Sequence, residues 1–105
     1  MKKEEKFLED HVQEDLIHLF QAFSSKTRLN ILYVLKKQAL TVTEISEKLQ
    51  MSQSAISHQL RRLKFARLVR DQRDGRKVIY TLTDKHIHDI FDLAIEHVKE
   101  IYHYE

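Results

Sequence analysis

The single glycine of this 105-residue chain, Gly75, lies between two short stretches in which apolar and polar residues alternate. Residues 68–72 and 77–82 show the two-residue period of β-strands, and the glycine falls where a hairpin needs a residue with positive φ. The chain contains no proline, so no strong breaker interrupts the remaining sequence. We therefore predict a mostly α-helical protein with one β-hairpin.

Two short helices are predicted immediately before the hairpin. Thr41 and Glu44 form the pattern of a capping box at the start of the first helix. Residues 50–51 supply a turn, and Ser52 can cap the second helix over residues 53–65, whose apolar residues recur at spacings of three and four. Two short helices joined by a tight turn make a helix-turn-helix, and a basic hairpin that follows directly is a wing.

The outward face of residues 53–65 is polar near its start and basic farther on. A recognition helix presents its N-terminal residues to base edges in the major groove, while nearby arginines and the wing reach phosphates or the minor groove. Serines near a helix start can instead be capping or surface residues, and for Ser52 we favour that alternative. The predicted DNA-binding residues are Gln53, Ser54, Ser57, His58, Gln59, Arg61, Arg62, Arg73, Arg76 and Lys77.

The positive charge of the chain is concentrated in one segment. Residues 61–77 hold eight Lys and Arg against two Asp, whereas the whole chain has a formal net charge of only +2 and a pI near 8.9. The rest of the chain is therefore net acidic. A basic block in an otherwise acidic small protein points to a polyanion bound on one face, most often nucleic acid. The alternative is a solvated charged face without a partner.

Two further helices are predicted ahead of the helix-turn-helix. The first, over residues 4–23, carries a long apolar stripe that calls for more burial than one small domain offers, which suggests that it joins a dimer interface. The alternative is a simple core helix. The second, over residues 27–37, is apolar on more than one face, so we expect it at the centre of the fold.

The C-terminal stretch predicts an amphipathic helix capped by Thr83 or Asp84, because its apolar residues recur at spacings of three and four. His86 and His97 return to nearly the same face but lie roughly 16 Å apart along the axis, too far to bind one ion. An antiparallel copy of the helix would set Asp84 and His86 opposite His97 and Glu100. Two imidazoles and two carboxylates suit tetrahedral zinc and leave cobalt or nickel possible; the alternative is ordinary surface histidines.

Composition excludes several other classes of protein. The absence of cysteine rules out disulfides and thiolate metal or redox sites, and it is consistent with a cytoplasmic protein. No apolar run is long enough for a membrane span, and the charged start is not a signal peptide. A chain of 105 residues has the size of one small domain, so we expect one domain over residues 1–105. We expect no enzyme and no small-molecule substrate, since the helix neighbours Ser57 and His58 point about 100° apart and a four-ligand zinc leaves no position for water.

The stretch SQSAISHQLRRLKFARLVRDQRDGRKVIYTL, residues 52–82, resembles the ArsR/SmtB family of winged helix-turn-helix, metal-responsive repressors. The similarity in the order of elements covers nearly the whole chain. It implies four helices, two strands and a last helix, assembled as a homodimer through the first and last helices. The spacing Asp84-x-His86 and His97-x-x-Glu100 is similar to the C-terminal helix site of the family's zinc sensors.

By this resemblance, Asp84 and His86 of one subunit and His97 and Glu100 of the other ligate Zn(II). The apo dimer is then expected to bind double-stranded operator DNA as a repressor, and zinc to release it and derepress genes for metal efflux or sequestration. In similar proteins the second ring nitrogen at the position of His97 is linked to a backbone carbonyl near Arg67.

Two alternatives stay open within this resemblance. The family's cysteine site has no counterpart in residues 42–46, so thiolate sensing of arsenic, lead or cadmium is not expected. Nickel and cobalt sensors of the family have additional histidine ligands near the chain ends. Nickel or cobalt sensing therefore stays possible for this chain, through His11, His18, His88 and His103. The other alternative is a winged-helix DNA-binding regulator that does not sense metal.

Overall fold

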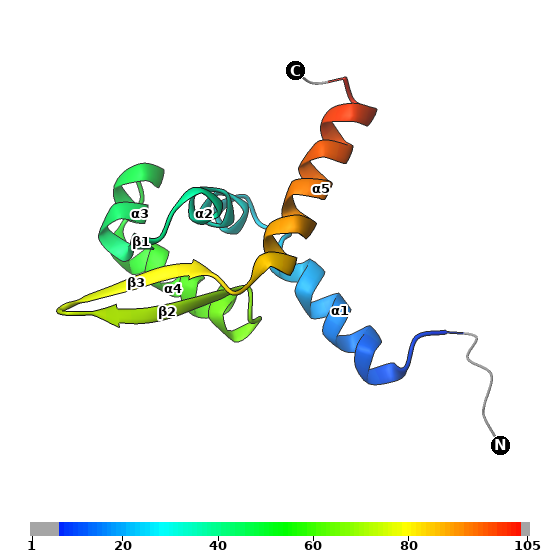
Figure 1. Cartoon of the computed structure of the whole chain (residues 1–105), viewed down its shortest axis with the longest axis horizontal. Coiled ribbons are helices and arrows are strands. Elements are labelled where there is room, and N and C mark those ends of the chain that lie inside the picture. Colours follow the sequence, from blue (N-terminus) through cyan, green and yellow to red (C-terminus); the bar gives the residue numbers. More distant parts are fainter. Residues whose placement is uncertain (1–6, 104–105) are drawn as a thin grey trace.

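The computed structural model describes residues 7–103 and arranges them as five helices and a three-stranded antiparallel sheet. In chain order the elements are α1 (Asp10–Ala22), α2 (Lys26–Lys37), β1 (Leu40–Thr41), α3 (Val42–Leu49), α4 (Gln53–Phe65), β2 (Val69–Asp74), β3 (Lys77–Leu82) and α5 (Lys85–Ile101). The β2–β3 hairpin extends to one side of the molecule, and α1 and α5 extend from the other (Figure 1). The predicted winged helix-turn-helix order is confirmed.

Helix α2 lies at the centre of the fold, as its apolar faces predicted. Ile31 and Leu32 have no exposed surface, and they belong to a buried cluster to which every helix and every strand contributes. Within residues 7–103 the buried side chains are all apolar. Burial of this cluster holds α2, the helix-turn-helix and the sheet together, because removing apolar surface from water is the main favourable term in folding.

Side-chain caps set the limits of the helix-turn-helix. The Thr41 hydroxyl accepts a hydrogen bond from Glu44 N at 3.2 Å, and the Glu44 carboxylate accepts one from Thr41 N at 2.8 Å, so the predicted capping box is present. Hydrogen bonding of the Glu44 carboxylate to the Thr41 backbone N–H, and next to the Thr41 side chain, lowers the pKa of Glu44. The turn into α4 begins at Gln50, which has a left-handed φ of 55°. Ser52 then caps α4 by accepting from Ala55 N at 3.1 Å.

Replacing Thr41 with alanine is expected to lower the free energy of unfolding by about 1 kcal/mol, the usual cost of losing a Ser or Thr cap. Both bonds of the capping box depend on Thr41, one through its hydroxyl and one through the geometry that the hydroxyl fixes. Urea unfolding followed by circular dichroism measures the change. The matched control is Thr43→Ala in the first turn of the same helix, where the side chain is exposed, and a loss equal to that of Thr41→Ala would contradict the capping argument.

The hairpin and the sheet differ from the prediction at their edges. β2 and β3 pair along their full lengths and leave a two-residue loop in which Gly75 has a φ of 66°, so the role predicted for the glycine is confirmed. The short loop carries β2 two residues beyond its predicted end. The short strand β1, which pairs with the other edge of β3, was not predicted, because two residues show no period.

The predicted start of the first helix is wrong. α1 begins at Asp10, and residues 7–9 precede it without helical structure, while residues 4–6 lie outside the described residues. Glu9 stands at the cap position but its side chain makes no capping bond, and Phe7 is 81% exposed. Neither a cap nor packing therefore stabilises an earlier turn of helix. None of the helices over residues 7–103 combines the length and hydropathy needed to cross a bilayer.

Candidate functional site

The predicted recognition helix α4 presents a polar face to solvent and an apolar face to the core. Most of the predicted DNA-binding residues on α4 are exposed and Ser57 is half-buried, whereas Ile56, Leu60 and Leu63 are buried. Burial of the apolar side fixes the rotation of α4, so its N-terminal polar residues face away from the protein. The exposed members of the predicted set on this helix are Gln53, Ser54, His58, Arg61 and Arg62.

Gln59 is placed differently from the other predicted DNA-binding residues of α4. Its side chain is half-buried, and its Oε1 accepts a hydrogen bond from Nη1 of Arg28 at 3.1 Å. Arg28 was not among the predicted site residues, because nothing in its neighbourhood in the sequence indicates that a residue 31 positions away is its partner. The carbonyl oxygen of the Gln59 amide is therefore engaged within the protein.

The wing carries its predicted basic residues at the exposed tip of the hairpin. Arg73, Arg76 and Lys77 are all exposed there, next to the two-residue loop. Lys64 has another role: its Nζ lies 2.9 Å from Oδ1 of Asp71 on β2, and this interaction raises the pKa of Lys64. The pair links the recognition helix to the wing.

The first pair of predicted metal ligands lies at the start of α5. Oδ1 of Asp84 accepts a hydrogen bond from Ile87 N at 3.2 Å, which confirms Asp84 as the helix cap. Nδ1 of His86 lies 3.6 Å from the same oxygen, and both side chains are well exposed. A carboxylate oxygen and an imidazole nitrogen therefore already face a common region of solvent.

The second pair, His97 and Glu100, lies near the other end of α5. Both residues are exposed and are separated by about one helical turn. Over residues 7–103, no three His, Cys, Asp or Glu side chains gather closely enough to hold a metal ion. Each end of α5 thus offers one carboxylate and one imidazole, a donor set that suits zinc, cobalt or nickel, and one chain supplies only half of a four-ligand site at each end.

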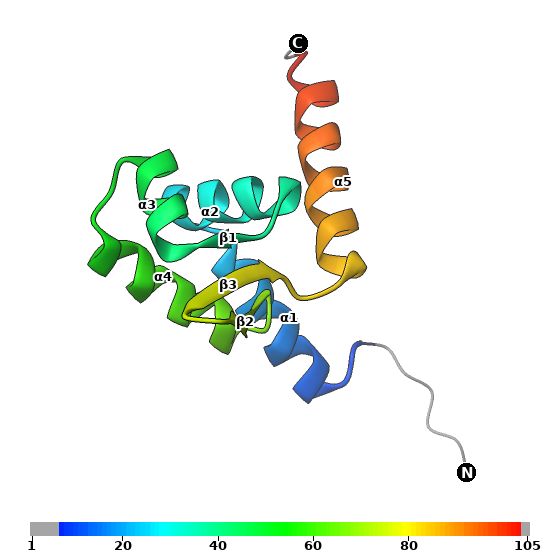
Figure 2. The ribbon, with the colours of Figure 1, turned by 60° about the vertical axis from the view of Figure 1, so that its left-hand side comes forward.

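The two pairs flank an apolar surface that the chain leaves uncovered. Phe20 and Leu93 are 59% and 65% exposed. A groove of about 410 Å³, lined by apolar residues and by Lys99, runs along α5 beside the end of α1 and the start of α2. In both views α5 stands away from the rest of the molecule beyond its first turns (Figure 2). Apolar surface of this kind, rimmed by polar residues, marks a site of protein association.

The root of α5 is fixed to the end of α2. Nε2 of His88 donates a hydrogen bond to the Lys36 carbonyl at 2.9 Å, and Nζ of Lys36 lies 2.7 Å from Oδ1 of Asp92. The Lys36 interaction holds the pKa of Asp92 below its ordinary value, so the ion pair persists at neutral pH and is lost only as the pH falls through that lowered pKa. His88, one of the four additional histidines, is therefore engaged within the chain.

A second link joins the start of α5 to the end of α4. The Thr83 hydroxyl donates a hydrogen bond to the Arg67 carbonyl at 2.7 Å, and Thr83 N donates to the Leu68 carbonyl at 3.0 Å. Arg67 adopts a left-handed φ of 62°, which ends the helix and turns its carbonyl toward Thr83. In similar proteins a backbone carbonyl in this region is linked to the residue at the position of His97. In this chain the Arg67 carbonyl accepts its hydrogen bond from Thr83, the residue just before Asp84. This contact of Thr83 was not predicted, because its partner is 16 residues away in the sequence.

Comparison with known proteins identifies the same region. Residues 25–71, which span α2, the helix-turn-helix and the start of the wing, match the family described as bacterial regulatory protein, arsR family. The transcriptional regulator NmtR of Mycobacterium tuberculosis is 37% identical over 95 residues, which cover 90% of this chain and 79% of NmtR. The transcriptional repressor SmtB homolog of Synechocystis is 34% identical over 87 residues, which cover 83% of this chain and 66% of that protein.

Solved structures agree with these relatives. The solution structure of apo-NmtR superposes with a TM-score of 0.76 at 35% identity and covers 100% of this chain and 87% of that one. A homodimeric winged helix-turn-helix DNA-binding domain from Mycobacterium bovis superposes with a TM-score of 0.84 at 21% identity, covering 96% of this chain and 97% of that one, and shows the same fold. The chain therefore belongs to the arsR family of bacterial regulatory proteins.

Proposed function

We propose that this protein is a dimeric, metal-responsive transcriptional repressor that binds operator DNA in its apo form and releases it when zinc binds. Proteins of its family regulate transcription and are not enzymes. The observation that carries the proposal is the arrangement on α5, where two exposed pairs of potential ligands flank an uncovered apolar face. Such a regulator acts in the cytoplasm, where the operator is.

A second copy of this chain is the proposed occupant of the apolar groove. The groove joins surfaces of α1, α2 and α5, and α1 adds exposed apolar residues beside it, among them Ile17 and Phe20. The homodimeric state of the M. bovis neighbour supports this choice. If the two copies of α5 cross in opposite directions, the Asp84 and His86 pair of one protomer faces the His97 and Glu100 pair of its partner, giving two equivalent sites.

The proposed zinc ligands fit a shared tetrahedral site. Bound zinc would hold two imidazoles and two carboxylates within about 2.2 Å of one point and so fix the relation between the two protomers. Asp84 keeps one carboxylate oxygen on the backbone of its own helix, which orients the other. Cobalt and nickel accept the same donor types, and His11, His18 and His103 remain candidates for additional ligands.

DNA binding is assigned to the N-terminal part of α4 and to the wing. Gln53, Ser54, Ser57 and His58 would face base edges in the major groove, since they lie on the first turns of the recognition helix. Phosphate contacts would come from the arginines on α4 and the tip of the hairpin: Arg61, Arg62, Arg73, Arg76 and Lys77. In a dimer both recognition helices must match two half-sites, so a changed dimer geometry lowers operator affinity.

The decisive experiment is a titration of operator binding with Zn(II), Co(II) and Ni(II), on the wild-type protein and on His97→Ala. We expect zinc to weaken operator binding by about 5- to 150-fold, the usual range of allosteric coupling, and His97→Ala to abolish this response while leaving apo binding unchanged. Glu96→Ala, which removes an exposed side chain next to His97 on α5 that is not a proposed ligand, is the matched control. Equal operator affinity with and without any of the three metals would refute metal sensing and leave a DNA-binding regulator of another kind.

A further inference from the structure

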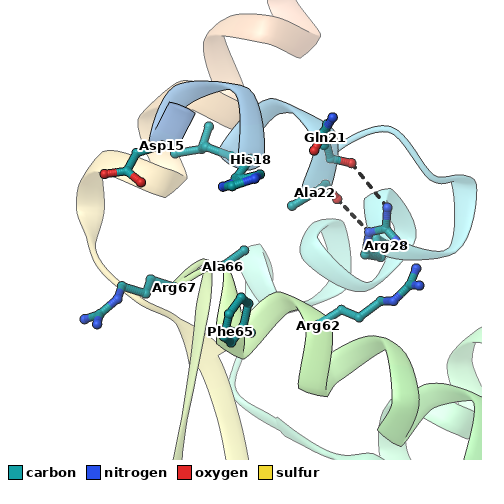
Figure 3. Close-up of a pocket in the computed structure, with 10 residues that line it drawn as sticks. Asp15, His18, Gln21, Ala22, Arg28, Arg62, Phe65, Ala66 and Arg67 are labelled. Atoms are coloured by element: carbon teal, nitrogen blue, oxygen red, sulfur yellow. Dashed lines mark hydrogen bonds between the residues drawn. The ribbon is translucent and has the colours of Figure 1, made fainter. Parts of the chain in front are cut away.

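Arg28 connects three elements of the fold through a single guanidinium group. Its Nε donates to the Ala22 carbonyl at 2.9 Å and its Nη2 to the Gln21 carbonyl at 3.2 Å, both at the C-terminal end of α1 (Figure 3). Its Nη1 donates to Oε1 of Gln59, which lies on the recognition helix α4. Arg28 itself stands in the first turn of the central helix α2.

This arrangement is specific to arginine. The last carbonyls of a helix have no partner within the helix and carry its negative dipole end, so a cation placed there stabilises α1. The planar guanidinium supplies a partner for the Ala22 carbonyl, adds a bond to the Gln21 carbonyl beside those from Ser24, and still reaches Gln59. A lysine presents one point charge that cannot fix all three acceptors. The bonds of Arg28 to the Ala22 carbonyl and to Gln59 are partly buried, which reduces competition with water, whereas the bond to the Gln21 carbonyl is exposed.

The end of α1 is also in contact with α5. The ring of Phe23, at the C-terminal cap of α1, lies 5.9 Å from the ring of Phe91 on α5, and Phe91 is buried. A continuous set of contacts therefore runs from α5 through Phe91 and Phe23 to the last carbonyls of α1, then through Arg28 to Gln59. It joins the helix that carries the proposed metal ligands to the helix proposed to read DNA.

We propose that Arg28 and Gln59 are positioning residues that transmit the arrangement of α1 and α5 to the recognition helix. This inference rests on the proposed function, because it names the route by which metal binding changes DNA affinity. α2 is held in the core, so a shift of the end of α1 changes the bonds to Arg28 and with them the position of Gln59.

The Arg28 contact acts at a different point of α4 from the Thr83 contact. Thr83 holds the Arg67 carbonyl just beyond the C-terminal end of α4, while Arg28 holds Gln59 near the middle of the helix. One fixed end and one driven point allow the axis of α4 to tilt about its C-terminal end, without a turn of the helix about that axis. That motion displaces its N-terminal residues most, and these are the residues assigned to the DNA bases.

The test compares Gln59→Met with Gln59→Glu. Methionine keeps the length of the side chain but removes the strong acceptor, while glutamate keeps an acceptor for Arg28. For each variant, operator affinity is measured in apo and zinc-saturated protein, and the ratio of the two dissociation constants gives the coupling. We expect Gln59→Met to reduce this ratio by about 2- to 30-fold, as mutations along a coupling route do, and Gln59→Glu to preserve it even if its added charge weakens both affinities.

Two further variants complete the design. Gln38→Met, at the exposed end of α2, is the matched control and should leave the ratio at the wild-type value. Arg28→Lys should reduce the ratio as Gln59→Met does. If circular dichroism shows that Gln59→Met does not fold, the ratio measured for Arg28→Lys tests the route in its place. Zinc affinity of the DNA-free dimer is measured in parallel by chelator competition, which separates loss of transmission from damage to the metal site.

The outcomes separate this inference from the proposed function. If wild-type protein responds to zinc and Gln59→Met responds equally, or if both affinities fall together at a constant ratio, Gln59 has only a structural role and the route is wrong. A ratio reduced equally in Gln59→Glu also overturns it, because the acceptor would then not matter. If wild-type protein itself shows no zinc response, the proposed function fails and the route fails with it.

Discussion

Two ligand-site variants that bind no zinc separately are expected to regain zinc binding when they are mixed. The first carries Asp84→Asn and His86→Ala, and the second carries His97→Ala and Glu100→Gln. In either homodimer both sites lack one of their two ligand pairs, so zinc affinity should fall by more than about 100-fold, beyond the usual cost of losing an outer-shell partner. In a mixed dimer one site has all four ligands and the other has none. Random exchange of subunits makes about half of the dimers mixed.

The measurement is the amount of tightly bound zinc in each homodimer and in the mixture after subunit exchange, by competition with a chromophoric chelator. Asparagine is used at position 84 because it can still cap α5 by accepting from Ile87 N, so a loss of helix stability is not mistaken for a loss of metal. A mixture as inert as its components would show that the ligands are not shared between protomers. Tight binding by either homodimer alone would show that the removed residues are not ligands.

Removing the three basic side chains of the wing tip is expected to weaken operator binding strongly and to make it less sensitive to salt. Arg73, Arg76 and Lys77 are exposed, and within residues 7–103 none of them forms an ion pair, so their charges are free to meet phosphate. Each phosphate that the protein no longer neutralises lowers the slope of log K against log salt by about 0.9. For two wings per dimer, the triple alanine variant should lower the slope by up to about 5.

Fluorescence anisotropy of a labelled operator at several salt concentrations measures this slope. Lys37→Ala removes a cation at the end of α2 near α5, away from the hairpin tip, and should change the slope by less than about 1. His58→Ala offers a contrast on the recognition helix: it should reduce discrimination between operator and unrelated DNA while changing the salt slope little. An unchanged slope in the wing variant would remove the hairpin from the DNA interface.

Local signals predicted the helix-turn-helix and the wing closely. The capping patterns of Thr41 and Ser52 fixed where α3 and α4 begin, because a capping hydroxyl and the helix it starts are neighbours in sequence. Gly75 located the hairpin for the same reason, since a positive φ is a local demand. The spacing of Asp84, His86, His97 and Glu100 likewise placed these residues as two pairs at opposite ends of one helix, and their role as metal ligands stays a prediction.

Contacts between distant segments could not be predicted in the same way. The bonds of Arg28 to Gln59, of Thr83 to the Arg67 carbonyl and of His88 to the Lys36 carbonyl depend on how the helices pack, and their partners are 31, 16 and 52 residues apart. Gln59 and His88 were therefore assigned from their own neighbourhoods alone, as a DNA contact and as an optional ligand. The start of α1 was placed too early because an apolar stripe indicates a helix but not the residue at which its stabilising contacts begin.

Because α5 is attached to the rest of its protomer at one end only, the distance from its free end to a partner protomer would depend strongly on the angle at which the two protomers cross. His88 and Asp92 hold the root of α5 to α2 and Ile95 packs against the core, whereas His97 lies roughly 8 Å beyond Asp92 on the exposed part of the helix. A swing of about 10° around Asp92 moves His97 by roughly 1.3 Å, while a metal–ligand bond tolerates only about 0.2 Å. Each shared site would combine ligands from the fixed end of one α5 with ligands from the free end of the partner's α5. Only a narrow range of crossing angles would therefore bring all four ligands to one metal ion.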